Sequence, residues 1–194
     1  MFLLSGLLPW MWFTGSVSDA TLAFTREAKL VRSTTIPRTI WVSRVILSKG
    51  IEFVASIPVI AIFAIATGAT LHWEALWFFV AVLLQAVLTL GIGLIVAPLV
   101  VFFRDLERAV KLGLRFLFYA SPIIYGLQDL RPLGLDTLGA FNPLSGIISL
   151  YRAAFFPQQL DWFAVAVSAG MSLVLFGIGV LIFRRTIRTV LKEI

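Results

Sequence analysis

Residues 75–103, ALWFFVAVLLQAVLTLGIGLIVAPLVVFF, form a run of 29 positions without a charged side chain. A helix rises about 1.5 Å per residue and needs about 20 apolar residues to cross the roughly 30 Å hydrocarbon core of a bilayer. Within such a helix every backbone polar group is satisfied inside the segment, as the bilayer requires. This run therefore predicts a membrane-spanning helix and indicates the class of the whole protein.

The composition of the remaining chain agrees with a membrane protein. Of the 194 residues, 60% are hydrophobic and only 13% charged, and the mean hydropathy is +0.99. Soluble domains have about 25% charged residues. The net charge of +6 does not indicate a nucleic-acid partner, because the basic residues are distributed between apolar runs and not gathered on one solvated face. The absence of cysteine excludes disulfides and thiol catalysis.

Apolar runs on both sides predict four further crossings, and so an all-α polytopic protein of about five transmembrane helices in a single domain, 1–194. Runs 53–71 and 162–183 are long enough alone, whereas run 116–128 is long enough only if its helix extends back past Lys111 and Arg115. Run 1–18 has no basic start and no A-x-A cleavage site, so we interpret it as a span and not as a signal peptide.

The basic residues predict the orientation. With five crossings, segments 19–52, 104–115 and 184–194 fall on one face, and they hold fourteen of the sixteen Lys and Arg residues. The positive-inside rule assigns this face, and with it the carboxyl terminus, to the cytoplasm. The two exceptions are Arg131 and Arg152. Four or six crossings would mix the faces, so the distribution favours five.

The polar segment 25–38, TREAKLVRSTTIPR, lies on the predicted cytoplasmic face. We expect Ser18 or Asp19 to cap the amino terminus of an amphipathic helix that runs into this segment. Pro37 is expected to end that helix. A short helix with a fixed break at the membrane surface suits the docking of another protein. The alternative is an interfacial loop whose charges only set topology.

The RDLER motif, 104–108, follows the 29-residue run and marks the return to the cytoplasmic surface. Here Arg104, Asp105 and Arg108 are expected to brace a short turn into the fourth span. The plainer interpretation is a charged turn at the membrane edge.

Prolines mark the outer side of the predicted bundle. Pro122 predicts that the fourth span bends or ends near Tyr125, because proline lacks an N–H and clashes with the preceding turn. In segment 142–156, Asn142 is the expected cap and Pro143 the first residue of a short helix containing Tyr151, which dips into the outer interface. On these residues alone, the helix is a structural re-entrant element.

Two groups of aromatic residues differ in their expected role. Trp73, Trp77, Phe78 and Phe79 flank an outer helix end and indicate an interfacial belt. By contrast, Trp10, Trp12 and Phe13 lie within the first span and are candidates to line a path through the membrane.

Catalysis within this chain finds no support in the sequence. The four lysines lack the glycines of a phosphate-binding loop, so any ATP must be bound by another subunit. One histidine, His72, lies in a predicted three-residue loop, and no carboxylate pair lies inside a span. We therefore expect no catalytic residue, cofactor or metal ion in this chain.

Three strings carry a resemblance to a known family. They are GLLPWMWFTGSVSDATLAFTREAKLVRSTTIPR at 6–38, VVFFRDLERAVKLGLRFLFYASPIIY at 100–125 and FNPLSGIISLYRAAFF at 141–156, about 75 of the 194 residues. In order and spacing they resemble the type-2 ATP-binding-cassette (ABC) permeases that export O-antigen, teichoic acid and other lipid-linked polysaccharides. Family members have six transmembrane helices after an amphipathic helix, so we expect this sequence to begin inside the second.

The resemblance implies a permease of the bacterial inner membrane that works as a homodimer with two ATPase subunits, which hold ATP and magnesium. Its substrate would be a lipid-linked glycan, and its surroundings membrane lipid. A drug or lipid exporter of the same superfamily, or a non-transporting scaffold or truncated paralogue, remain alternatives. The expected ATPase-coupling residues are Arg26, Glu27, Leu30, Arg32, Pro37 and Arg38; the expected channel or outer-gate residues are Trp10, Trp12, Phe13, Pro122, Tyr125, Asn142, Pro143 and Tyr151.

Overall fold

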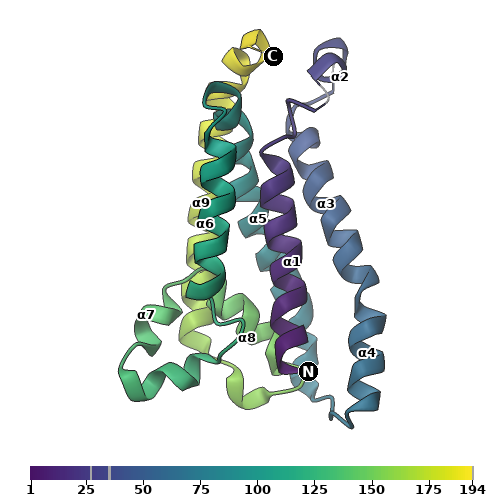
Figure 1. Ribbon diagram of the computed structural model, residues 1–194, viewed down its shortest axis with the longest axis vertical. Helices are drawn as coiled ribbons and strands as arrows, with labels where there is room; N and C mark the ends of the chain where they lie inside the picture. Colours follow the sequence, from purple (N-terminus) through teal and green to yellow (C-terminus); the bar gives the residue numbers. More distant parts are fainter. Residues whose placement is uncertain (27, 35, 194) are drawn as a thin grey trace.

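Five long helical segments run side by side along the long axis of the molecule (Figure 1). The computed structural model describes residues 1–26, 28–34 and 36–193, without the side chains of residues 31, 32, 133, 188 and 191–193. The segments are α1 (Phe2–Ala20), α3 with α4 (Thr39–Ala55 and Ile57–Ala66), α5 (Trp77–Phe102), α6 (Leu106–Ala120) and α9 (Trp162–Glu193). The predicted all-α polytopic class is confirmed.

Three segments are long and apolar enough to cross a membrane: Thr39–Ala66, Trp73–Phe102 and Trp162–Ile187. α1 and α6 lie beside them but do not meet this criterion. With 15 residues, α6 extends only about 22 Å, which is less than the thickness of the hydrocarbon core. Length and composition alone therefore do not establish α1 and α6 as membrane crossings.

The two ends of the bundle differ in charge. At the end drawn uppermost in Figure 1 lie α2 (Ala28–Ser33), the turn between α5 and α6, and the carboxyl-terminal part of α9. This end, with the helix segments next to it, holds fourteen of the sixteen Lys and Arg residues; we call it the basic end. The opposite end holds η1 (Trp73–Leu76), η2 (Leu127–Leu133), α7 (Asp136–Ala140), α8 (Ser145–Ala153) and η3 (Pro157–Gln159).

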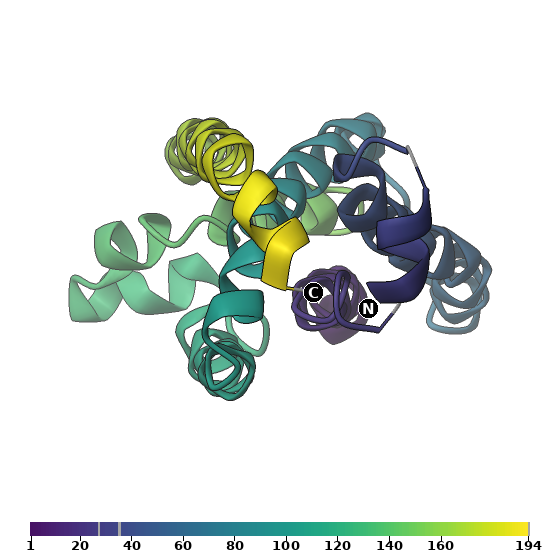
Figure 2. The same cartoon turned by 90° about the horizontal axis from the view of Figure 1, so that it is seen from above.

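The centre of the bundle is the pair α5 and α9, whose backbones touch. A Cβ atom on Gly91 would lie 2.6 Å from the backbone nitrogen of Phe176, and one on Gly179 would collide with the carbonyl of Gly91. Small residues at a helix crossing allow this close approach inside membranes. Seen from above, α4 and α7 lie at opposite sides of the bundle (Figure 2), and none of the residues of α4 is buried.

The second predicted span begins earlier than expected. The sequence predicted a polar segment 19–52 before a span at 53, whereas α1 continues to Ala20 and α3 begins at Thr39. Trp41, Val42 and Ile46 are buried at helical spacing on the inner face of α3, which extends the helix past its charged positions. A break at Ser56 separates α3 from α4, because the missing N–H of Pro58 fits the first turn of a new helix.

The fourth predicted span, 116–128, is wrong in its outer half. α6 ends at Ala120, and Ser121 is extended at φ −93° and ψ 144°, as the residue before a proline usually is. The predicted bend or end at Pro122 is confirmed. The backward extension past Lys111 and Arg115 is also confirmed, since α6 begins at Leu106.

Candidate functional site

The polar segment of the basic end is shorter and more tightly packed than the sequence predicted. The expected cap by Ser18 or Asp19 is wrong, because both residues lie in the last turn of α1. A turn follows over 21–26, in which Phe24 is fully buried with its ring 6.1 Å from that of Phe183 in α9. The remaining helix, α2, has six residues, 28–33.

Three expected coupling residues, Arg26, Leu30 and Pro37, are exposed together at the basic end. Arg38 has a different environment: its Nη1 donates hydrogen bonds to the carbonyls of Thr34 at 2.7 Å and Ile36 at 3.0 Å. It therefore closes the turn around Pro37. Glu27 and the side chain of Arg32, which were also expected to contribute, lie outside the described residues.

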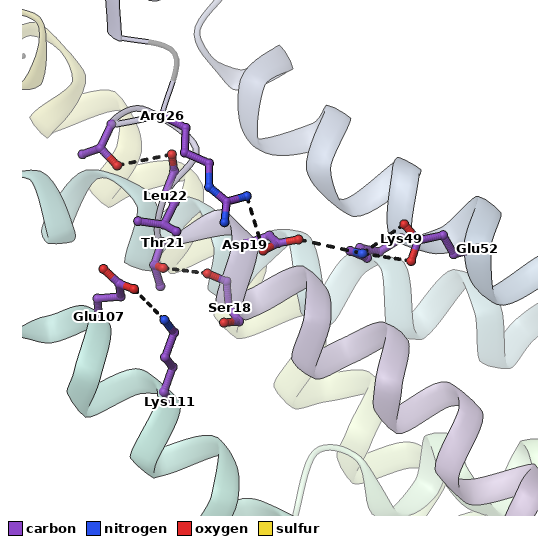
Figure 3. Close-up of polar contacts among 10 residues, drawn as sticks. Ser18, Asp19, Thr21, Leu22, Arg26, Lys49, Glu52, Glu107 and Lys111 are labelled. Atoms are coloured by element: carbon purple, nitrogen blue, oxygen red, sulfur yellow. Dashed lines mark hydrogen bonds and ion pairs between the residues drawn. The ribbon is translucent and has the colours of Figure 1, made fainter.

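A chain of ion pairs connects this segment to two helices (Figure 3). The carboxylate of Asp19 in α1 lies 3.7 Å from Nη1 of Arg26 and 3.9 Å from Nζ of Lys49 in α3, and that ammonium donates to Glu52 at 2.9 Å. A cavity of about 230 Å³ lies beside these groups. Each half-exposed pair contributes at most about 1 kcal/mol. The chain of ion pairs matters because it connects the loop to both α1 and α3.

Neither Asp19 nor Lys49 was identified from the sequence as part of this connection. The spacing of Lys49 and Glu52, three residues apart on one helix, was the available signal. The role of Asp19 depends on contacts with residues 7 and 30 positions later in the chain, which no local pattern reveals.

The expected turn residues divide between two elements. Arg104 and Asp105 are exposed in the turn between α5 and α6, whereas Arg108 lies in the first turn of α6. The carboxylate of Glu107 accepts a 2.6 Å hydrogen bond from Nζ of Lys111 instead of pairing with either arginine. The turn is thus held by backbone hydrogen bonds, such as that from the N–H of Leu106 to the carbonyl of Phe103.

A groove of about 560 Å³ lies between α1 and α6. It is lined by Trp10, Thr14, Gly15 and Ser18 of α1 and by Lys111, Leu114, Arg115, Phe118 and Tyr119 of α6. We call it the α1–α6 groove. The rings of Trp10 and Phe118 lie 5.5 Å apart in it, so aromatic faces from two helices meet there.

Of the three aromatic residues proposed for the path, Trp12 points away from Trp10 and Phe13, whose rings lie 5.8 Å apart. Trp10 lines the α1–α6 groove. Trp12 instead stacks on Phe53 at 5.2 Å and donates its Nε1 hydrogen to the carbonyl of Ile46 at 3.2 Å. Phe13 is 1% exposed within the core. Trp10 and Trp12 are two residues apart and so differ by about 200° around the helix, which separates their side chains.

At the opposite end, Asn142 connects two helices. Its Nδ2 donates hydrogen bonds to the carbonyl of Ala120 at 3.1 Å and to Oγ of Ser121 at 2.9 Å. Its Oδ1 accepts the N–H of Leu144. The expected cap therefore holds the turn before the helix, and α8 begins at Ser145, later than the predicted start at Pro143.

Arg152 is one of the two basic residues outside the predicted cytoplasmic face, and the structure shows that its side chain is buried. The side chain is 2% exposed, and it donates hydrogen bonds to the carbonyls of Ile123 at 2.5 Å and Tyr125 at 2.9 Å. Its guanidinium also lies 3.7 Å from the ring centre of Phe2. Burial lowers the pKa of Arg152 to about 10, so it stays protonated at neutral pH. It fixes the residues that follow Pro122 against α8 and α1.

Tyr151, an expected gate residue, is buried next to Arg152. Its ring contacts those of Phe53 at 5.6 Å and Phe78 at 5.4 Å. All nine residues of α8 are buried. The predicted short helix is thus confirmed, and it is inserted among α1, α5 and α9.

Comparison with known proteins shows which family has this architecture. Residues 1–156 match the family described as ABC-2 type transporter. The chain belongs to this family. Two permeases from Klebsiella pneumoniae, each named O-antigen export system permease protein RfbA, are 31% identical over 186 residues, 95% of this chain and 71% of their own length. A permease of the same name from Myxococcus xanthus is 31% identical over 160 residues, 82% of this chain and 62% of its own.

Family membership confirms the resemblance carried by the three sequence strings. The ABC-2 permease is a multi-pass membrane protein and a membrane subunit of an ABC transporter, which works with an ATPase partner.

Proposed function

We propose that this chain is the permease subunit of an ATP-driven exporter that moves a lipid-linked polysaccharide of the O-antigen type across the bacterial cytoplasmic membrane. The observation that carries the proposal is the identity to permeases named for O-antigen export, which extends over 95% of this chain. Tyr119, which lines the α1–α6 groove and is 73% exposed, supports it, because sugar rings place their C–H faces on aromatic rings.

In this proposal the basic end faces the cytoplasm and docks the ATPase, which holds ATP and magnesium. Leu30, 49% exposed at this end, is an apolar contact of the kind that a partner covers. Movement of loop 21–38 reaches α1 through Asp19 and Arg26, and reaches α3 through Lys49. Two permeases and two ATPases form the working unit, with α1 and α6 of each permease beside the path.

A deletion experiment tests the transport function. Removing the gene from its host should abolish the surface polysaccharide, while lipid-linked polymer accumulates inside the cell, since synthesis continues without export. A plasmid copy should restore the surface polymer. Unchanged surface polysaccharide would contradict the proposal, and a gain of drug sensitivity in the same strain would favour the drug-exporter alternative.

A second experiment tests the docking site. Native mass spectrometry of the complex, purified with its host's ATPase, should show two copies of each subunit. A Leu30→Asp, Arg32→Asp double variant should lose the ATPase, because the apolar side chain of Leu30 is removed and the charge at position 32 is reversed. Leu138→Asp is the control, since Leu138 is equally apolar and 68% exposed at the opposite end. Retention of the ATPase by the double variant would refute this docking site.

A further inference from the structure

An apolar cavity of about 240 Å³ lies at the opposite end of the bundle, between α4 and the helices α1, α5 and α8. We call it the α4 cavity. Phe53 of α3, Ile57 and Ile60 of α4, and Phe78 of α5 form much of its wall. Among the described residues that line it none is charged, so an occupant of this cavity has an uncharged, apolar body.

The α4 cavity lies at membrane depth. Its residues from α3 and α4 belong to the candidate span Thr39–Ala66, and Phe78 belongs to the span Trp73–Phe102. Ile62 and Ile65 of α4 are 65% and 82% exposed, as expected of a surface that faces hydrocarbon. The molecules that surround the cavity are therefore phospholipids, and the part of them found at this depth is the acyl chain.

The cavity also separates α4 from the rest of the protein. None of the residues of α4 is buried, and the helix lies at the edge of the bundle (Figure 2). Phe53 precedes the break at Ser56 and Ile57 follows it, so the cavity extends across the break. Side chains around an empty apolar space lose packing contacts. An occupant that packs on both α4 and the bundle would restore these contacts.

One polar group in the wall lacks a partner. Tyr151, which lines the cavity from α8, is 4% exposed, and its hydroxyl has no hydrogen-bond partner among the described residues. The other polar side chain of the lining, Ser5, donates a hydrogen bond to the carbonyl of Phe2 at 3.0 Å. A buried hydroxyl without a partner costs free energy. The wall therefore provides one unused donor to an occupant that carries an acceptor.

We propose that the α4 cavity binds an acyl chain of a phospholipid from the leaflet at the opposite end, and that the ester carbonyl of this chain accepts a hydrogen bond from the hydroxyl of Tyr151. An ester-linked chain is uncharged, apolar along its length, and has a carbonyl acceptor at one end. The charged headgroup stays outside the cavity. This lipid remains bound to the permease and holds α4 against the bundle, so the inference is independent of the transported substrate.

A pair of lipids that differ only in the ester carbonyls tests the hydrogen bond. Native mass spectrometry of the delipidated permease–ATPase complex in detergent gives the Kd of dimyristoyl phosphatidylcholine and of its diether analogue. For the wild type, the Kd of the diether lipid should be about fivefold higher, the contribution of one ordinary hydrogen bond. In Tyr151→Phe the two lipids should bind equally. An equal Kd of both lipids for the wild type would overturn the proposal.

Filling the cavity tests its position. Ala75 lies in the cavity wall, so Ala75→Phe should raise the Kd of both lipids at least tenfold. Ala61→Phe is the matched control, because it makes the same change at an exposed residue of α4 outside the lining, and its Kd should stay within twofold of the wild type. Equal binding by the two variants would place the lipid elsewhere and overturn the proposal.

Thermal unfolding separates lipid binding from a purely structural role of Tyr151. Without lipid, Tyr151→Phe should be at least as stable as the wild type, because the substitution removes an unpaired hydroxyl. Saturating diester lipid should then raise the Tm of the wild type more than that of Tyr151→Phe. A lower Tm of the variant without lipid, followed by equal increases with lipid, would show that the hydroxyl serves only the fold and would overturn the proposal.

A competitor identifies the kind of chain. Farnesyl phosphate has an isoprenoid chain and no ester carbonyl, so it should displace dimyristoyl phosphatidylcholine at least tenfold more weakly than unlabelled diester lipid does. Displacement at equal concentrations would assign the cavity to an isoprenoid chain and overturn the proposal.

Discussion

Replacement of Arg152 by methionine should destabilise the opposite end of the permease severely. Methionine has a similar length but no donor, so the buried carbonyl of Ile123 and the partly buried carbonyl of Tyr125 both lose their hydrogen bonds. The guanidinium contact with the ring of Phe2 is lost as well. These three contacts hold α8, the residues after Pro122, and the start of α1 together.

The magnitude follows from those contacts. Each carbonyl left without a donor costs about 1–3 kcal/mol, and a desolvated cation–π contact contributes about 2 kcal/mol. The substitution also removes the free-energy cost of desolvating the guanidinium, and this offsets part of the loss. The two carbonyls therefore set the scale, and because the lost ring contact and the removed desolvation partly cancel, we expect a loss of about 3–5 kcal/mol. For a chain of this length this corresponds to a fall in Tm of roughly 6–20 °C.

Thermal unfolding of the purified complex in detergent, followed by intrinsic tryptophan fluorescence, provides the assay. Arg131→Met is the control, since Arg131 is exposed in η2, and its Tm should stay within about 2 °C of the wild type. Arg152→Lys should be intermediate, because an ammonium keeps the charge but lacks the planar fork of donors. A Tm of Arg152→Met equal to that of the control would refute the reasoning.

Further predictions concern other parts of the fold. Gly91→Ala should lower stability by about 1–3 kcal/mol, because its methyl group would press on the backbone of α9; Gly170→Ala, where the added atom meets open space, should be neutral or stabilising by up to about 1 kcal/mol. Equal Tm values for the two alanine variants would contradict the close helix crossing. Asn142→Ala should cost about 1–2 kcal/mol and speed hydrogen exchange at the amide of Leu144, which loses its acceptor; unchanged exchange there would count against the cap. Asp19→Asn should change stability by no more than about 1 kcal/mol yet lower the amount of polymer exported per ATP hydrolysed, and an unchanged ratio would rule out a role for its ion pairs in coupling.

The long helices could be predicted from the sequence because their signal is local. Twenty consecutive apolar residues are enough to specify a span, as in 75–103, whatever lies elsewhere in the chain. The start of α3 at Thr39 could not be found in this way. A hydropathy average treats Lys49 and Glu52 as the end of a span, whereas the structure continues the helix through them, and Lys49 pairs there with Glu52 and with Asp19 of α1.

The contacts of the candidate sites depend on partners distant in the sequence. The acceptors for Arg152 lie 27 and 29 residues earlier, in a segment that is irregular only because Pro122 ends α6. Similarly, Trp10 and Trp12 look equivalent in the sequence, and only the positions of α3 and α6 decide which one faces the groove. The sequence thus shows where charged and aromatic residues occur, but it does not show which of them contact each other.

The backbone contact between Gly91 and Gly179 leaves no side chain between α5 and α9 that could give way. For the proposed transport cycle we therefore expect α5 and α9 to stay together as a rigid pillar, and α1, α3 and α6 to be the mobile helices that move relative to it. The α1–α6 groove is bounded by two of these mobile helices and by neither helix of the pillar. We therefore expect the width of this groove to change more than that of the α5–α9 contact during the proposed transport cycle.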